Sequence, residues 1–428
     1  MNAQLDFTIE RLGECRFPSP MQGVRFTLDS ERIMYHSRFD EIEGCIGDGG
    51  EPPTLELAGP RERIFFEPAK TACGIVTCGG LCPGINDVIR AVTLSLHHHY
   101  GVRKVYGFRY GYEGLVKRLG HTPLDLTPEA VGHIGELGGT ILASSRGPQK
   151  PAEMVDNLEE LGIGVLFTVG GDGTLKGAGA LAAEARRRGL PLSIIGIPKT
   201  IDNDISFVQK TFGFETAVTE AHRAIYAAHV EAGGARNGIG LVKLMGRDSG
   251  FIAAFASLID SQVNFCLIPE APFSLAGFLG ALQRRLESRG HAVVVVAEGA
   301  GQELLAATAE RDTSGNIKFG DIGTFLRDAI KWHFAARSME VTLKYIDPSY
   351  IIRSQPANTH DSALCLLLGH SAVHAGMAGR TNMVVGFWNH QFTHVPITLA
   401  TSARKKIDPE GWLWSSVLAS TGQPREML

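Results

Sequence analysis

Residues 165–174 read VLFTVGGDGT, a mostly apolar run that ends in a glycine-flanked aspartate and a threonine. Such a run predicts a strand buried on both faces, as in a parallel sheet covered by helices. Residues 175–188 then place apolar side chains three and four apart, which predicts an amphipathic helix. The segment therefore predicts a βα unit with Asp172 at the carboxyl end of the strand, where α/β proteins bind ligands.

The same alternation extends through most of the chain. Strands are predicted at residues 72–77, 104–108, 165–169, 192–197, 238–244, 265–268, 292–297 and 382–387. Amphipathic helices are predicted at residues 87–100, 175–188, 215–232, 275–288 and 322–338. One hydrophobic core usually stops growing at about 250 to 300 residues, so 428 residues predict an α/β fold with two core-bearing units. Residues 1–70 lack this rhythm and contain the turn-rich stretch GDGGEPP at 47–53, so we interpret them as an N-terminal extension.

Composition limits the partners and the compartment. A formal net charge of -4 argues against a nucleic-acid or anionic-membrane partner, because both require an excess of Lys and Arg. Residues 1–15 have no secretory pattern and no apolar run approaches the roughly 18 residues of a membrane span, so we expect a cytoplasmic protein with a small-molecule partner. Seven cysteines in a long chain are typical of reduced thiols. Cys73, Cys78 and Cys82 approach an iron–sulfur spacing, but a buried strand and its following loop is the alternative.

Two further clusters follow predicted strands. Residues 77–86, TCGGLCPGIN, form a glycine-rich turn before a helix, which suits a phosphate because backbone N–H groups and a helix N-terminus point at the anion. Residues 197–205, IPKTIDNDI, place two carboxylates beside a lysine and a hydroxyl. Phosphoryl transfer needs a base for the acceptor hydroxyl and cations for the moving group, and Asp202 is the best base candidate.

Structural interpretations compete with these readings. Asp172 could serve only as an N-cap of the next helix, and residues 202–204 could form an Asx turn that ends a strand. The stretch at 177–182 matches G-x-G-x-x-A but falls inside a predicted helix, so a dehydrogenase has little support. Neither the P-loop pattern nor H-E-x-x-H occurs in the sequence.

In this order, GGLCPGIN at 79–86, GGDGT at 170–174, PKTIDND at 198–204 and MGRDSG at 245–250 resemble the 6-phosphofructokinase family. The resemblance runs from about residue 71 to residue 400. GGDGT alone is also similar to NAD kinases and lipid kinases, which leave the other motifs unexplained. KYIDPSYIIR at 344–353 is similar to longer members from plants, trypanosomatids and some bacteria, which also carry N-terminal extensions.

The resemblance implies two three-layer α/β lobes with mainly parallel sheets. Residues 71–213 and 352–400 correspond to an ATP-binding lobe, and residues 214–351 and 401–428 to a fructose 6-phosphate lobe with a C-terminal segment. It also implies a homotetramer. Short bacterial members receive an arginine from a neighbouring subunit at the position of Gly238 here, so the role of nearby Arg236 and the allosteric effectors stay open.

The resemblance also implies roles for individual residues. The nucleotide contacts would be Gly80, Arg109, Arg146, Gly171, Gly173 and Thr174, with Asp172 on Mg²⁺. The sugar contacts would be Thr200, Asp202, Asp204, Met245, Gly246, Arg247, Glu298, Lys344, Tyr350 and Arg353. The catalytic group would comprise Asp202 as base, Thr200, and Lys199 and Arg247 as cations on the moving phosphoryl group.

The expected reaction is Mg²⁺-dependent transfer of the ATP γ-phosphoryl group to the 1-hydroxyl of fructose 6-phosphate. Pyrophosphate is the alternative donor, because Lys199 is compatible with either one. Gly173 favours ATP, because a carboxylate there would fill the space of the α-phosphate and repel it. A non-catalytic sugar-phosphate sensor is a further alternative, although it would be expected to have lost Asp202.

Overall fold

The computed structural model describes residues 5–47, 49–305, 310 and 318–427, and these form two compact units. The first unit comprises Met1–Thr200, Ile205–Gly213 and Gln355–Ala403. The second comprises Ile201–Asp204, Phe214–Ser354 and Arg404–Leu428. Each unit is therefore built from segments that are far apart in the sequence.

The first unit contains a nine-stranded sheet in the order β3-β4-β17-β16-β10-β9-β6-β7-β8. Its parallel centre consists of β6 (Ala72–Thr77), β7 (Lys104–Phe108), β9 (Ile163–Gly170), β10 (Ser193–Pro198) and β16 (Met383–Trp388). Thr77 pairs with Val169, and Pro198 pairs with Gly170. The turns that follow β6, β9 and β10 consequently emerge side by side at one edge of the sheet.

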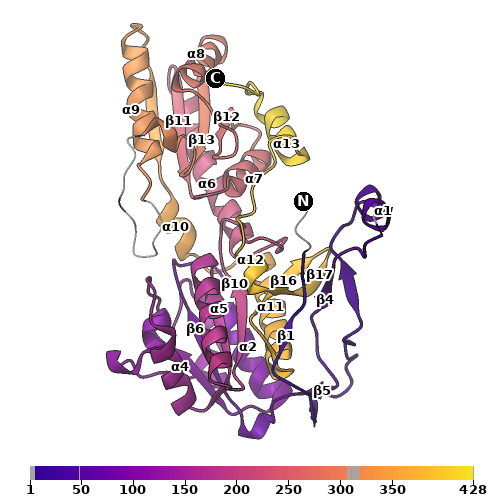
Figure 1. Cartoon of the computed structure of the whole chain (residues 1–428). Helices are drawn as coiled ribbons and strands as arrows, with labels where there is room; N and C mark the ends of the chain where they lie inside the picture. The colour runs from indigo at the N-terminus through magenta and orange to yellow at the C-terminus, as the bar shows by residue number, and fades with distance from the viewer. Residues whose placement is uncertain (1–4, 48, 306–309, 311–317, 428) are drawn as a thin grey trace. The chain divides into compact units, whose positions relative to one another are not determined.

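Helices cover both faces of this sheet (Figure 1). A Cβ at Gly196 in β10 would meet Leu175 of α5 (Asp172–Arg187), whereas a Cβ at Gly376 in α11 (Thr359–Met377) would meet Phe167 of β9. Gly196 pairs with Thr168, so these two residues face the same side of the sheet. Phe167 is the neighbour of Thr168 in β9 and therefore points to the opposite side. The first unit therefore has three layers. Helix α2 (Ile85–Leu94) packs beside α11, and α4 (Pro151–Glu160) beside α5.

Residues of the N-terminal extension contribute strands to the first unit. β3 (Arg32–Met34) pairs with β4 (Thr54–Leu57), which pairs with β17 (Gln391–Pro396), and all three run antiparallel to their neighbours. Two short strand pairs, β1 (Glu10–Arg11) with β15 (Arg380–Thr381) and β2 (Phe17–Pro18) with β5 (Arg63–Ile64), add further contacts. No regular sequence pattern marks these strands, because each has only two to four residues.

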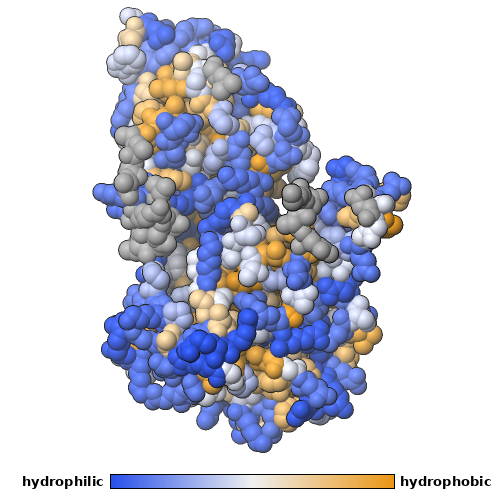
Figure 2. Space-filling view, viewed as in Figure 1, coloured by the Kyte–Doolittle hydropathy of each residue, from blue (hydrophilic) through white to orange (hydrophobic). Residues whose placement is uncertain are grey.

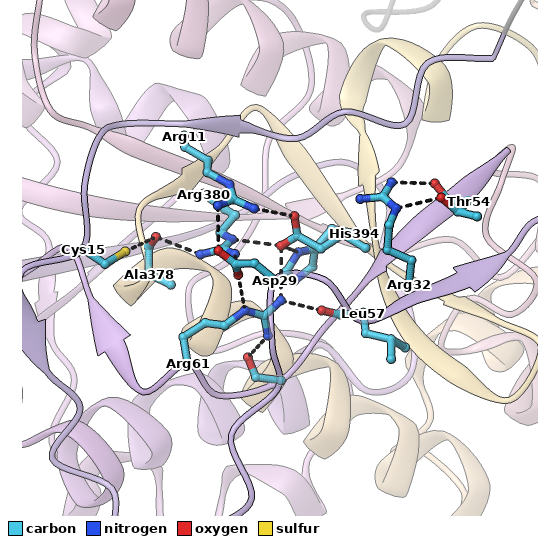
Figure 3. Close-up of polar contacts among 12 residues, drawn as sticks. Arg11, Cys15, Asp29, Arg32, Thr54, Leu57, Arg61, Ala378, Arg380 and His394 are labelled. Carbon is cyan, nitrogen blue, oxygen red and sulfur yellow. Dashed lines mark hydrogen bonds and ion pairs between the residues drawn. The ribbon is translucent and has the colours of Figure 1, made fainter. Parts of the chain in front are cut away.

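A buried ionic cluster fixes this region (Figure 3). Glu56 accepts hydrogen bonds from Nε of Arg380 at 3.0 Å and from Nη2 of Arg61 at 3.2 Å, and its Oε1 lies 3.1 Å from Nδ1 of His394. Asp29 accepts a further hydrogen bond from Arg61 at 3.0 Å. Burial works to raise the pKa of Glu56, but the hydrogen bond with His394 and the charges of Arg380 and Arg61 outweigh it and hold that pKa far below its ordinary value.

The second unit contains a four-stranded parallel sheet in the order β12-β13-β11-β14. Its strands are β12 (Phe265–Leu267), β13 (His291–Ala297), β11 (Gly238–Leu244) and β14 (Thr342–Ile346). A Cβ at Gly240 would meet Ala228 of α6 (Phe214–Gly233), whereas its neighbour Leu241 packs with side chains of α8 (Leu275–Arg289) and α9 (Ile322–Ala335). The second unit is therefore also three-layered. Its other helices are α7 (Phe251–Ile259), α10 (Ser349–Ser354) and α13 (Trp412–Thr421).

All eight predicted strands are present, each within two residues of its predicted ends. The predicted helix at 87–100 divides into α2 and a π-helical turn at Ser95–Tyr100, and the other predicted helices are α5, α6, α8 and α9. Cys73 lies in β6, Cys78 and Cys82 are buried in the turn that follows it, and burial raises the pKa of the Cys78 thiol to about 12. This placement agrees with the alternative of a buried strand and its following loop.

The visible surface is mostly hydrophilic, with hydrophobic residues in separate patches (Figure 2). Among the helices in the described part of the chain, none is long and apolar enough to cross a membrane.

Candidate active site

Three turns of the first unit meet at the carboxyl ends of its central strands. The side chain of Lys199, the residue after β10, donates a hydrogen bond to the carbonyl oxygen of Gly80 in the turn after β6. A Cβ added at Gly171, in the turn after β9, would lie 3.4 Å from the backbone oxygen of Lys199. The structure thus brings Gly80, Gly171 and Lys199 together, as the sequence predicted from the strand ends.

Asp172 is the first residue of α5, and the N-cap is Gly171, so the interpretation of Asp172 as an N-cap is wrong. Its side chain is 14% exposed and lies 3.0 Å from Nζ of Lys176. Thr174 is buried two residues later, where its backbone oxygen accepts a hydrogen bond from the Tyr112 hydroxyl at 2.6 Å. A carboxylate and backbone N–H groups at a helix N-terminus can serve a metal ion and a phosphate respectively.

Gly173 and Gly170 differ in the space around them. A Cβ at Gly173 would have nothing within 4 Å, whereas a Cβ at Gly170 would lie 2.1 Å from the Thr174 hydroxyl oxygen. Gly170 is thus required by packing inside the protein. Gly173 borders open space, which leaves room for a ligand.

The two predicted arginines of the first unit lie on loops near these turns. Arg109 directly follows β7 and donates a hydrogen bond to the Tyr110 hydroxyl at 3.1 Å. Arg146 is exposed, on a loop whose Ser144 hydroxyl donates to the carbonyl oxygen of Gly79 at 2.6 Å. The loop of Arg146 is therefore anchored to the glycine-rich turn.

The donor set of the first unit fits Mg²⁺ bound through substrate phosphates. Groups of three or more His, Cys, Asp or Glu side chains placed to hold a metal do not occur in the described ranges. Mg²⁺ commonly binds through one or two carboxylates, several waters and phosphate oxygens rather than an all-protein cage. Asp172 supplies one such carboxylate.

In the second unit, Asp202 lies among acidic groups. One of its carboxylate oxygens is fully buried. Burial, followed by the negative charges of Asp204, Glu298 and Asp248, raises the pKa of Asp202 well above its ordinary value, and Arg404 opposes the shift. A carboxylate with a raised pKa is a stronger base and is better suited to accept a proton in catalysis.

The loops after β11 and β13 lie side by side. Glu298 N donates to the oxygen of Leu244 at 2.9 Å, and Gly299 N donates to the oxygen of Gly246 at 3.0 Å. Gly246 adopts a φ of +130°, and a Cβ there would lie 2.6 Å from the oxygen of Ser249, so this turn requires glycine. These bonds bring the segment from Met245 to Arg247 next to Glu298.

Burial raises the pKa of Glu298, and the charges of Lys243, Arg247 and Arg353 work in the opposite direction. Arg247 also lies over the ring of Phe319, with its guanidinium carbon 4.5 Å from the centroid. The charges of Arg247 and Arg353, two further residues predicted for the sugar site, thus both act on Glu298.

The remaining predicted residues are less closely grouped. Lys344 pairs with Gly240 in the sheet, short of the strand end, and its Nζ lies 3.4 Å from Glu231 of α6. Tyr350 is 79% exposed on α10, and the Arg353 guanidinium carbon lies 5.1 Å from its ring centroid.

Sequence reasoning missed Lys243, Arg404 and Lys405. Lys243 Nζ lies 2.8 Å from Asp347, and its charge acts on Glu298. The signal for Lys243 was a lysine inside an otherwise apolar predicted strand. Arg404 and Lys405 follow the region of resemblance, and no local pattern marks them.

Two helix-covered sheets, one with a parallel centre and one fully parallel, carry a lysine, carboxylates and glycine-rich turns at their strand ends and define an α/β enzyme of the phosphoryl-transfer class. The family profile for phosphofructokinase matches residues 72–376, and the chain belongs to this family. It is 48% identical over 443 residues to an ATP-dependent 6-phosphofructokinase of Borreliella burgdorferi, covering 100% of this chain and 98% of that one. A protein of the same name from Trypanosoma cruzi is 47% identical, over 97% of this chain and 87% of the relative.

Solved structures share the fold. A pyrophosphate-dependent phosphofructokinase from Marinobacter aquaeolei superposes with a TM-score of 0.67 at 20% identity, covering 83% of this chain and 92% of that one. Phosphofructokinase from Pichia pastoris gives a TM-score of 0.64 at 22% identity, over 91% of this chain and 45% of that one. The predicted α/β fold class is confirmed.

Proposed function

We propose that this chain transfers the γ-phosphoryl group of ATP to the 1-hydroxyl of fructose 6-phosphate, giving fructose 1,6-bisphosphate and ADP. The observation that carries the proposal is Asp202, a carboxylate enclosed among acids beside the loops of Arg247 and Glu298. Support for the donor and the acceptor comes from relatives named ATP-dependent 6-phosphofructokinase that are 45 to 49% identical to this chain.

Asp202 acts as the general base. Its carboxylate takes the proton of the 1-hydroxyl while that oxygen forms a bond to the γ-phosphorus and the bond to the β-phosphate oxygen of ADP breaks. Burial beside Asp204, Glu298 and Asp248 makes the carboxylate more basic than an exposed aspartate. Thr200 and Asp204, which flank Asp202 in the PKTIDND segment, contribute to sugar binding.

Positive side chains stabilise the negative charge on the phosphoryl group during its transfer. Lys199 and Arg247 provide cations for its equatorial oxygens. Asp172 would hold Mg²⁺, which supplies charge neutralisation to the donor phosphates when it is bound. The first unit binds the nucleotide through Gly80, Arg109, Arg146, Gly171, Gly173 and Thr174.

The second unit binds the sugar phosphate. Glu298 accepts a hydrogen bond from a sugar hydroxyl, and Met245 and Gly246 line the sugar beside Arg247. Lys344, Tyr350 and Arg353 bind the 6-phosphate, for which Arg353 offers a planar fork of N–H donors.

The assembly and the compartment are part of the same proposal. We infer a homotetramer, since closed symmetry makes a dimer of dimers a common assembly. We also infer a cytoplasmic location. Light scattering at several protein concentrations tests the assembly, and a mass of one chain at all of them would contradict it.

The function is tested by purified protein with Mg²⁺, fructose 6-phosphate, and either ATP or pyrophosphate. Formation of fructose 1,6-bisphosphate is expected with ATP and not with pyrophosphate. A higher kcat/KM with pyrophosphate would overturn the donor assignment, and no product with either donor would overturn the function.

A further inference from the structure

Arg404 and Lys405, which the motifs leave without a role, hold Asp204 in the second unit. Nη1 of Arg404 donates a hydrogen bond to Oδ2 of Asp204 at 2.6 Å, and the Asp204 side chain is only 3% exposed. The backbone N–H of Lys405 donates to the carbonyl oxygen of Asp204 at 2.8 Å. Two successive residues therefore fix both the carboxylate and the backbone of Asp204.

The same segment also reaches the MGRDSG loop. Ile407 N donates to Oε1 of Glu270 at 3.0 Å, and Glu270 accepts from Gly250 N at 3.0 and 3.1 Å. In turn, the Ser249 hydroxyl donates to the carbonyl oxygen of Asp202 at 3.3 Å. Residues 404–407 thus connect the loop of Asp202 and Asp204 with the loop that follows β11.

Charge adds to this connection. The carboxylates that act on Asp202 are Asp204, Glu298 and Asp248, and Arg404 is the cation that opposes them. Lys405 lies with Nζ 5.3 Å from the ring centroid of Phe251, and burial, partly offset by Asp204, lowers its pKa to about 7. An arginine stays protonated at any working pH, so Arg404 is a permanent positive charge at this position.

From these contacts we infer that Arg404 is a positioning residue for phosphoryl transfer: it holds Asp204, keeps the loop of Asp202 in place and counters the acidic charge around Asp202. The inference rests on the proposed function, because it assigns Asp202 the role of base. Arg404, 200 positions after Asp204 in the sequence, therefore helps to hold the residues of the reaction centre in place.

The test compares Arg404→Gln with Arg404→Lys in the full-length protein. The readout is the pH dependence of kcat with ATP and fructose 6-phosphate. Loss of the cation leaves Asp202 among uncompensated acids, so Asp202 binds its proton more tightly and the acid limb moves to higher pH. On that limb we expect kcat of Arg404→Gln to fall about tenfold or more, and the loss to shrink as the pH rises. Arg404→Lys keeps the charge and should largely retain the parent profile.

Controls separate this effect from unfolding. Arg425→Gln removes another arginine of the C-terminal segment, which pairs with Glu410 and is half exposed, and its profile should match the parent. If Arg404→Gln loses its cooperative thermal transition, Arg404→Met, which keeps the aliphatic part of the side chain, takes its place. A loss of kcat by the same factor at every pH, or a profile like that of Arg425→Gln, would overturn the inference. An inactive parent enzyme would instead refute the proposed function, which does not depend on Arg404.

Discussion

Glu56 of β4 accepts a hydrogen bond from Nε of Arg380 at 3.0 Å, and 324 residues separate the two along the chain. Both side chains are almost fully buried, at 3% and 2% exposure. A strand of the N-terminal extension and the segment that leads into β16 are thus joined by a charged contact inside the first unit. This contact explains how residues of the N-terminal extension, which lie outside the region of family resemblance, become part of the first unit.

Glu56→Gln should reduce the free energy of unfolding by up to roughly 3 to 5 kcal/mol, because it leaves the buried Arg61 and Arg380 charges with only the half-exposed carboxylate of Asp29. Urea unfolding followed by circular dichroism measures the change. Glu14→Gln is the matched control, since its pair with Arg16 is about four-fifths exposed and should contribute at most about 1 kcal/mol. Equal effects of the two substitutions would show that the buried cluster does not stabilise the fold.

Stability should also fall in mild acid because of His374. Nδ1 of His374 shares a hydrogen bond of 2.8 Å with the Tyr100 hydroxyl, and burial, then the charges of His370 and His99, lowers the pKa of His374 to about 3. The unfolded chain, with a pKa near 6.5, binds more protons than the folded one between these values. This group therefore costs up to about 1.4 kcal/mol of stability for each pH unit below about 6.5.

His374→Gln should flatten that pH dependence, as measured by urea unfolding between pH 5 and pH 8. His360→Gln, at an exposed position of the same helix α11, serves as the control and should leave the dependence unchanged. An identical pH dependence in the parent and His374→Gln would contradict the assignment.

Asp202→Asn should retain the fold and fructose 6-phosphate binding but lower kcat by about 10² to 10⁴, the usual range for loss of a general base. Steady-state kinetics and calorimetric titration with the sugar phosphate measure the two effects. Asp328→Asn, which alters an exposed aspartate of α9, is the control. Turnover within about tenfold of the parent would remove Asp202 from the role of base.

Arg353→Ala should weaken the apparent affinity for fructose 6-phosphate more than that for ATP, because a guanidinium bound to a phosphate contributes roughly 1.5 to 3 kcal/mol. The KM values of the two substrates provide the comparison. Arg327→Ala, at a partly exposed position of α9 paired with Asp328, should change neither value. An unchanged sugar KM for Arg353→Ala would indicate a structural arginine.

Gly173→Asp should suppress turnover with ATP. A Cβ at this position meets no protein atom within 4 Å, so the substitution is expected to leave the fold intact and to place a carboxylate in the open space beside the donor site. Gly44→Asp is the control, because a side chain there also enters open space and the backbone φ is negative. Gly162→Asp is unsuitable, because its φ is +65°. Full ATP activity in Gly173→Asp would contradict the steric and electrostatic explanation of donor choice.

The sequence predicted the parallel strands well because each is a nearly continuous apolar run, as Ala292 to Ala297 illustrates. It predicted the turns at Asp172 and Asp202 because glycine and carboxylates follow buried strands. It could not predict β4, whose four residues include the buried charge of Glu56, since that charge is compensated only in three dimensions. Arg404 was missed for the same reason, because its partner Asp204 lies in a distant part of the sequence.

The pairing of β4 with β17 has a consequence for synthesis. β4 ends at Leu57, and β17 is complete only at Pro396, so the ribosome must add more than three hundred residues before this part of the sheet can close. At about 5 to 20 residues per second, the interval is roughly 20 to 70 seconds. An unpaired strand edge is a template for pairing with other chains. The nascent polypeptide is therefore most exposed to aggregation during translation of the segment between these strands, and a chaperone would be most useful to it then.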